Sequence, residues 1–439
     1  MTTRKKKPAG TGKQTPRTLR EKTRKTLKKM EKTDAERKKR DKKLLIAAIA
    51  GSAVLLAAGL VLAGALAVRA FAPPVLGFRD VSEEIQNSVA EYAHAQTESG
   101  GKKWKIITID PSLPMRKQIK LFKKTDMLIT RSGAAADELG AYAKLPAQKD
   151  LLLMPTAIRK AGTEGGRQYA LPLLLDHYEL SWDYSLVRTG EPAGPRTLEA
   201  LESSARKLKS PSRWPFMCAG GEDEALLNLV GALAEALGGE KEWESVLLAA
   251  RETAPGELVR SPALAAVMEN LIRWRREGLL HPEWFRMSRG DVESFMETGA
   301  APYVFMSLSN HRKISQRTVE KYNSVFMPGT EADAPRSLTA PAILLLAPQR
   351  NRVREEAVLL KDALLDAEQQ TTLSGKTGLA PASSTAAAPD RQANEARLWA
   401  AASERPLPSF FAALYPDPAD TALFAKQVRE FLKTDGAEN

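Results

Sequence analysis

The sequence feature that most constrains this chain is an uncharged apolar run near its N-terminus. Residues 44–68 are 25 consecutive positions without a charged side chain. At about 1.5 Å of rise per residue, a helix of this length exceeds the ~30 Å hydrocarbon core of a bilayer. We therefore predict one transmembrane helix over residues 44–68.

The basic charge of the protein lies almost entirely in front of this run. Residues 1–43 hold 19 Lys and Arg against 5 Asp and Glu, so the remaining residues carry 46 basic and 48 acidic side chains. The remainder lacks the basic footprint of a nucleic-acid-binding domain, and we expect no nucleic-acid partner. The Lys and Arg asymmetry predicts a cytoplasmic tail and an extracytoplasmic main domain.

A cleaved signal peptide is the alternative to a permanent anchor. Ala70-Phe71-Ala72 offers a small-x-small cleavage pattern, but Pro73 would follow the cut. The apolar run and its 43-residue head are also longer than those of a secretory signal, whose apolar part spans about 7–15 residues. We interpret the run as an uncleaved signal anchor in the cell membrane.

Cysteine and histidine usage argues against several kinds of site. Cys218 is the only cysteine, so no intramolecular disulfide can form. The four histidines have neither HExxH nor HxH spacing; they are His94, His177, His281 and His311. We therefore predict neither a metal site nor a cofactor.

After residue 72 the pattern is that of an α/β domain. Strands are expected within 75–79, 103–109 and 126–130, with helical patterns between them, which is typical of a parallel sheet with crossovers. The segment "YALPLLLDHYELSWDYSLV" (169–187) is apolar and strand-like but holds Asp176, His177 and Tyr178 in its middle. Residues 196–280 are largely helical, and further strands and helices follow to the end.

Five short motifs, in a fixed order, carry a resemblance to a known family. They are Pro172 followed by "LLLDHYE" and "LSWDYSL" (180–186), "PRTLEAL" (195–201), "FMETGAAPY" (295–303), "YNSVFMPGT" (322–330) and "LLKDALLDAEQQTTLSGKTGLAPASS" (359–384). Together they resemble the extracytoplasmic solute-binding proteins of ABC importers, in particular the sugar-binding, maltose-binding-protein-like group. The resemblance covers nearly all of residues 75–439.

This resemblance implies a bilobal periplasmic-binding-protein-like fold with two α/β lobes joined at a hinge. Lobe 1 is expected at about 75–178 and 330–375, and lobe 2 at about 180–328 and 380–439. Ligand then binds in the cleft, at the carboxyl ends of strands, and closes the lobes. The Asp176-His177-Tyr178 group is expected where the chain crosses the hinge.

Sugars are held by carboxylates, amides and aromatic faces, which gives the candidate ligand-binding residues. Arg131 follows an expected strand and could hold an anion. The full set is Asp176, Tyr178, His177, Trp182, Arg131, Trp214 and Asn310.

The expected function is a membrane-anchored receptor that captures a small solute, with carbohydrate the expected class, and delivers it to the permease subunits of an ABC transporter. Two alternatives remain open. One is a degenerate binding fold that acts as a membrane-tethered interaction or sensory module. The other is a penicillin-binding-type serine enzyme, because Ser204-x-x-Lys207 and Lys376-Thr377-Gly378 match two of its three motifs. The third motif is missing, and we predict a protein without catalytic activity.

Overall fold

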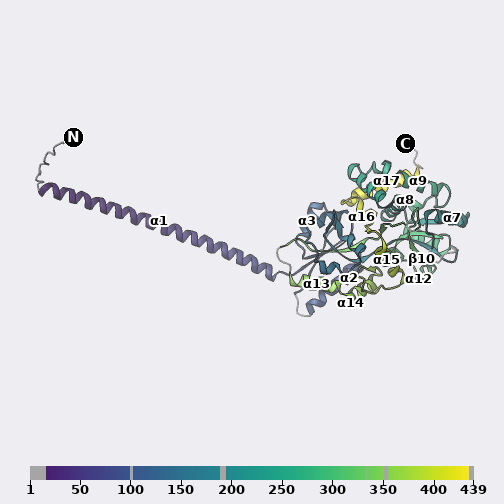
Figure 1. The fold of residues 1–439 in the computed structure, drawn as a ribbon, viewed down its shortest axis with the longest axis horizontal. Coiled ribbons are helices and arrows are strands. Elements are labelled where there is room, and N and C mark those ends of the chain that lie inside the picture. The colour runs from purple at the N-terminus through teal and green to yellow at the C-terminus, as the bar shows by residue number, and fades with distance from the viewer. Residues whose placement is uncertain (1–15, 99–101, 188–193, 333, 351–353, 435–439) are drawn as a thin grey trace, which may run out of the picture. The chain divides into compact units, whose positions relative to one another are not determined.

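The computed structural model describes residues 16–98, 102–187, 194–332, 334–350 and 354–434. It divides into two units, Met1–Ala72 and Pro73–Asn439. Figure 1 shows the ribbon of both units. Each unit is considered by itself below.

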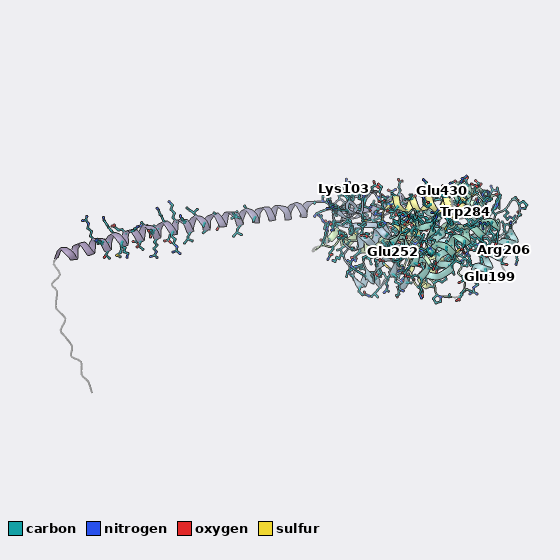
Figure 2. The ribbon with its side chains drawn as sticks, turned by 90° about the horizontal axis from the view of Figure 1, so that it is seen from above. Lys103, Glu199, Arg206, Glu252, Trp284 and Glu430 are labelled. Atoms are coloured by element: carbon teal, nitrogen blue, oxygen red, sulfur yellow. The ribbon has the colours of Figure 1, made fainter. Side chains whose placement is uncertain are left out.

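The first unit contains one long helix, α1 (Pro16–Phe71), which includes the whole predicted span. The charged segment before residue 44 is also helical, because it is rich in Lys, Arg and Glu, which are good helix formers. The side chains drawn in Figure 2 stand out from this helix, and Leu44, Leu45 and Leu55 are 60–75% exposed. In the described part of the chain, α1 supplies the one helix that is long and apolar enough to cross a membrane.

The second unit is built on two sheets. The first has six strands in the order β13-β6-β12-β3-β1-β2. Its strands are β1 (Val75–Arg79), β2 (Lys105–Thr108), β3 (Met127–Arg131), β6 (Leu171–Leu175), β12 (Ala342–Leu346) and β13 (Ala380–Pro381). Strand β1 pairs in parallel with both β2 and β3, as the alternating strand and helix patterns predict. Strand β12 runs antiparallel between β3 and β6.

The second sheet has four strands in the order β10-β7-β9-β8. They are β7 (Tyr178–Asp183), β8 (Phe216–Cys218), β9 (Tyr303–Ser307) and β10 (Tyr322–Phe326). The apolar segment 169–187 is therefore two strands in two different sheets, broken at Asp176-His177. Two small sheets pair β4 (Thr163–Glu164) with β5 (Arg167–Gln168) and β11 (Leu338–Thr339) with β14 (Pro406–Leu407).

Helices of the second unit cover both sheets (Figure 1). They are α2 (Glu83–Glu98), α3 (Met115–Phe122), α4 (Ala134–Gly140), α5 (Gln148–Leu151), α6 (Thr156–Arg159), α7 (Leu198–Leu208), α8 (Asp223–Glu252), α9 (Ala265–Arg276), α10 (Arg289–Glu297), α11 (Leu308–His311), α12 (Gln316–Val319), α13 (Glu355–Leu365), α14 (Ala367–Thr377), α15 (Arg391–Ala402), α16 (Phe410–Leu414) and α17 (Pro418–Lys433). Short 3₁₀ segments are η1 (Lys160–Gly162), η2 (Leu258–Arg260), η3 (Pro262–Leu264) and η4 (Trp284–Arg286).

Local sequence explains where several of these helices begin and end. Ser288 and Asp291 form a capping box at the start of α10, and the Asp390 side chain accepts a hydrogen bond from the Ala393 N–H at the start of α15. Helix α14 ends at Gly378, which adopts a left-handed conformation with φ of 69°. Helix α8 joins two helical segments across a kink at Gly239, whose φ is 71°.

Each sheet has its own hydrophobic core, and we call the two halves the first lobe and the second lobe. The core of the first lobe joins β1, β3, β6 and β12 to α2, α13 and α15. The second lobe packs β7, β8 and β9 against α8, α9 and α17, with a smaller core that includes Met217 and Met296. Ala380, Ala393 and Ala400 lie in the first core, although the sequence prediction assigned residues from 380 onward to lobe 2. We propose that lobe 1 includes residues 380–402 as a third segment.

Gly133 marks a close approach between the lobes. It precedes α4 with φ of 142°, and a Cβ atom there would lie 2.5 Å from the carbonyl oxygen of Ala412 in α16. We expect Gly133→Ala to lower the free energy of unfolding by about 1–3 kcal/mol, because it combines overpacking with backbone strain. Urea titration measures this effect. Gly256→Ala is the matched control, since a Cβ at Gly256 meets nothing within 4 Å; equal losses in both variants would contradict the expectation.

Candidate functional site

The chain passes from the first lobe to the second at Asp176, between β6 and β7. The Asp176 carboxylate accepts hydrogen bonds from the backbone N–H of His177 (2.9 Å), and from the N–H (3.0 Å) and hydroxyl (2.6 Å) of Ser309. Burial raises the pKa of Asp176, while these hydrogen bonds and the nearby Arg131 oppose the rise. The crossing segment is thereby fixed to α11, which directly follows β9 of the second sheet.

Arg131 connects the two lobes directly. It ends β3, and its Nη1 atom lies 2.5 Å from Oε1 of Glu224, in the first turn of α8. Glu224 raises the pKa of the Arg131 guanidinium, and the carboxylates of Asp80 and Asp176 add to this effect. Asp80 follows β1 with φ of 50°, a strained conformation of the kind that gathers at functional sites. The carboxyl ends of β1 and β3 therefore present charged groups toward the second lobe.

A narrow pocket lies on the second-lobe side of this ion pair. Its lining residues are Tyr178, Ala219, Glu224, Ala225, Asn228, Arg289, Val292, Phe305, Met306, Ser307, Asn310 and Ile314. Arg289 donates a hydrogen bond from Nη1 to Oδ1 of Asn310 at 3.3 Å. The free space is about 20 Å³, whereas ligand pockets typically hold about 300–1,000 Å³. In this arrangement the pocket has room for a water molecule and none for a sugar.

Four of the seven sequence-predicted residues come together here. Tyr178 and Asn310 line the pocket, Arg131 binds its wall residue Glu224, and Asp176 binds Ser309 next to Asn310. Tyr178 is 4% exposed, and its hydroxyl lies 3.8 Å from the Cys218 sulfur. Burial raises its pKa well above the ordinary value for tyrosine.

The other three predicted residues lie elsewhere. His177 is 1% exposed, its ring lies 5.3 Å from that of Trp399, and neither ring nitrogen has a partner within the described ranges. Burial lowers the pKa of His177 to about 4. Trp182 is buried in the second-lobe core and lines a different pocket. Trp214 packs edge-on against His281 beside an open pocket of about 440 Å³. Ligand contact by any of the seven residues stays a prediction.

The two charged residues of the pocket, Glu224 and Arg289, were not predicted from the sequence. An acidic residue in the first turn of a helix usually stabilises the helix dipole, so Glu224 gave no separate signal. The Gly220-Gly221 pair is a sequence feature that could have indicated a close backbone contact next to the pocket. A Cβ at Gly221 would lie 2.6 Å from the Arg286 carbonyl oxygen, so the glycine lets the start of α8 approach the segment before α10. The Arg289 N–H then donates to Glu222 at 2.8 Å.

The residues behind the serine-enzyme alternative make other contacts. Ser204 lies on α7 and accepts a hydrogen bond from the Tyr303 hydroxyl at 2.8 Å. Lys376 lies on α14 and pairs with Glu91 of α2, in the first lobe. The two motifs thus belong to different lobes.

Two α/β lobes, a chain crossing between them and charged groups at the facing strand ends define the bilobal periplasmic-binding-protein-like fold. No family model matches the sequence, and no curated protein matches it. Solved structures do match the fold. The bacterial solute receptor AcbH, described as having an exclusive substrate preference for β-D-galactopyranose, shares 14% identity at a TM-score of 0.64, over 83% of this chain and 98% of its own.

Two further structures have the same fold. The proposed binding protein MsmE of Bacillus subtilis subsp. subtilis strain 168, in an open conformation, has 14% identity and a TM-score of 0.66, over 83% of this chain and 94% of its own. A protein classed as a secreted solute-binding lipoprotein of Streptomyces coelicolor has 14% identity and a TM-score of 0.57, over 83% and 98%. The fold predicted from the motifs, that of sugar-binding solute receptors, is confirmed.

Proposed function

We propose that the second unit, Pro73–Asn439, is the solute receptor of an ABC-type importer and binds a carbohydrate between its lobes. The observation that carries the proposal is the meeting of both lobes at Arg131 and Glu224, beside Tyr178, Asn310 and the crossing residue Asp176. Amide, hydroxyl and charged groups around a partly apolar wall suit sugar hydroxyls. Three solved neighbours described as binding galactopyranose, maltotriose and maltotetraose support this ligand class.

Binding requires the lobes to separate first. With about 20 Å³ of free space, the pocket cannot admit a pyranose ring while Arg131 and Glu224 are paired. A ligand that contacts both lobes then favours reclosure, since only the closed form offers it both sets of contacts. The ligand hydroxyl groups would then bind to Arg131 and to Glu224 separately, in place of the direct ion pair between these two residues.

The proposal is tested on the full-length chain in detergent. All seven tryptophans belong to the second unit, so their fluorescence reports its unfolding alone. We expect one or more of D-galactose, maltose and maltotriose to raise the unfolding temperature. Asn310→Ala should weaken the binding of that sugar about fivefold, through loss of a hydrogen bond worth about 1 kcal/mol.

Asn87→Ala is the control, because Asn87 is exposed on α2, away from the pocket. The same affinity in Asn310→Ala and in the unsubstituted protein would remove Asn310 from the ligand site. Failure of every sugar to raise the unfolding temperature would contradict carbohydrate binding.

A second candidate function is a tethered interaction module that no longer binds solute. The Arg131–Glu224 pair favours it, because this contact occupies the space between the lobes that a ligand would need. A module of this kind should show no temperature shift with any solute. It would also stay closed when Glu224→Ala removes the ion pair, as measured by small-angle X-ray scattering.

The remaining parts of the proposal concern the setting of the domain. Helix α1 would anchor the chain by a single span at 44–68, with the basic tail in the cytoplasm and the receptor outside. The permease subunits of the importer would be its protein partners. The receptor would carry out no catalysis.

A further inference from the structure

A second pocket lies at β10, the edge strand of the second sheet. Its lining residues are Trp182, Pro195, Arg196, Asn323, Ser324, Val325, Phe326, Ala332, Arg391, Glu395 and Trp399. None of these residues lines the narrow pocket beside Glu224. The walls come from β7 and β10 of the second lobe and from α15, whose apolar side packs in the core of the first lobe.

This pocket has the size and the walls of a small-molecule site. Its free space is about 350 Å³, within the range of about 300–1,000 Å³ that ligand pockets occupy. Three aromatic side chains line it: Trp182 is buried, whereas Phe326 and Trp399 are partly exposed. The rings of Phe326 and Trp399 meet edge-on, with centroids 5.8 Å apart. A partly exposed ring offers a face to the C–H surface of a sugar.

The polar rim favours a ligand with many hydroxyl groups. Arg391 donates from Nη2 to Oδ1 of Asn323 at 2.8 Å, and its Nε atom lies 3.8 Å from Oε1 of Glu395. Arg391, Asn323 and Glu395 thus place hydrogen-bond donors and acceptors side by side on the rim. Hydroxyl groups both donate and accept, and they can bind to each of these side chains.

We propose that this pocket is a second binding site, and that it takes a single pyranose ring or the terminal ring of an oligosaccharide. The site is independent of the proposed function of the cleft. A ring seated there would contact both lobes next to the crossing segment, because Trp399 also packs against His177. Its occupancy would therefore depend on the relative position of the lobes.

Equilibrium dialysis of radiolabelled D-galactose and maltotriose against the full-length chain in detergent tests the proposal. The pocket variant carries Asn323→Ala and Arg391→Ala, both on the rim, and the cleft variant carries Asn310→Ala. Arg116→Ala, exposed on α3, is the control for loss of a surface charge. We expect the pocket variant to lose one class of sugar-binding sites, or to bind sugar at those sites at least tenfold more weakly. The cleft variant and the control should retain that class of sites.

Identical dialysis curves for the pocket variant and the unsubstituted protein would overturn the second site, and so would curves without any bound sugar. A protein that binds no sugar in the cleft, which would contradict the proposed function, gives a different pattern. In that case the sugar-binding sites that Asn310→Ala weakens are missing, while the sites that Asn323→Ala and Arg391→Ala weaken are present.

Discussion

Glu179→Ala is expected to lower the free energy of unfolding of the second unit by about 3 kcal/mol, because it removes a buried acceptor that several hydrogen-bond donors share. Glu179 is 1% exposed. Its carboxylate lies 2.5 Å from Nδ1 of His311. It also accepts hydrogen bonds from the Ser181 and Ser324 hydroxyls, both at 3.0 Å, and from Nε2 of Gln392 at 2.8 Å.

The charge of Glu179 depends on these partners. Burial alone would raise its pKa, but His311 and the other donors outweigh burial and lower the pKa of Glu179 below its usual value. Alanine would leave the buried His311 and Ser181 and the partly exposed Gln392 and Ser324 without this acceptor, which is the costly outcome for a polar network. Gln392 lies on α15 and Glu179 on β7, so the network also joins the lobes beside the crossing segment.

Urea unfolding of the full-length chain in detergent, followed by tryptophan fluorescence, measures this effect. Glu179→Gln keeps the size and one acceptor, and should lose less stability than Glu179→Ala. Glu320→Ala, exposed at the end of α12, should change the free energy of unfolding by no more than about 0.5 kcal/mol. A loss below about 1 kcal/mol for Glu179→Ala would mean that the network contributes little.

Local sequence predicted the fold well because the fold depends on patterns that are themselves local. The β-branched alternation of residues 103–109 predicted β2, and the strand and helix succession predicted the parallel pairing of β1 with β2 and β3. The family resemblance, carried by local motifs, placed the crossing point at the polar group in 169–187, and Asp176 and His177 do separate two fully buried strands.

The site was predicted less completely because its contacts join residues far apart in the chain. Arg131 and Glu224 are 93 positions apart, and Glu179 and His311 are 132 positions apart. The sequence around Trp182 does not show whether its side chain lines the second pocket, as it does, or the cleft between the lobes. The same reason explains why residues 380–402 were assigned to lobe 2 and are now proposed for lobe 1. The sequence of a helix shows which of its faces is apolar, but not which of the two lobe cores that face packs against.

His177 should make the stability of the second unit depend on pH. Its pKa is about 4 in the folded protein because the ring is buried, compared with about 6.5 in the unfolded chain. The unfolded chain therefore binds the proton first as the pH falls. The contribution of the neutral His177 ring to the free energy of unfolding is therefore fully present above pH 6.5. It is lost as the pH falls from 6.5 through 4. Between pH 7.5 and 4.5 we expect a loss of about 2–3 kcal/mol from this residue.

Urea unfolding at several pH values, with the unsubstituted protein and His177→Phe compared, isolates this contribution. Phenylalanine keeps a ring beside Trp399 and cannot take up a proton, so its stability should fall less between pH 7.5 and 4.5. Asp137 titrates in the same range, because burial raises its pKa to about 6. Its contribution has the opposite sign, is present in both proteins and cancels in the difference. His94→Phe, at an exposed position on α2, should keep the pH dependence of the unsubstituted protein. If His177→Phe keeps it as well, His177 is not the group that takes up the proton on unfolding.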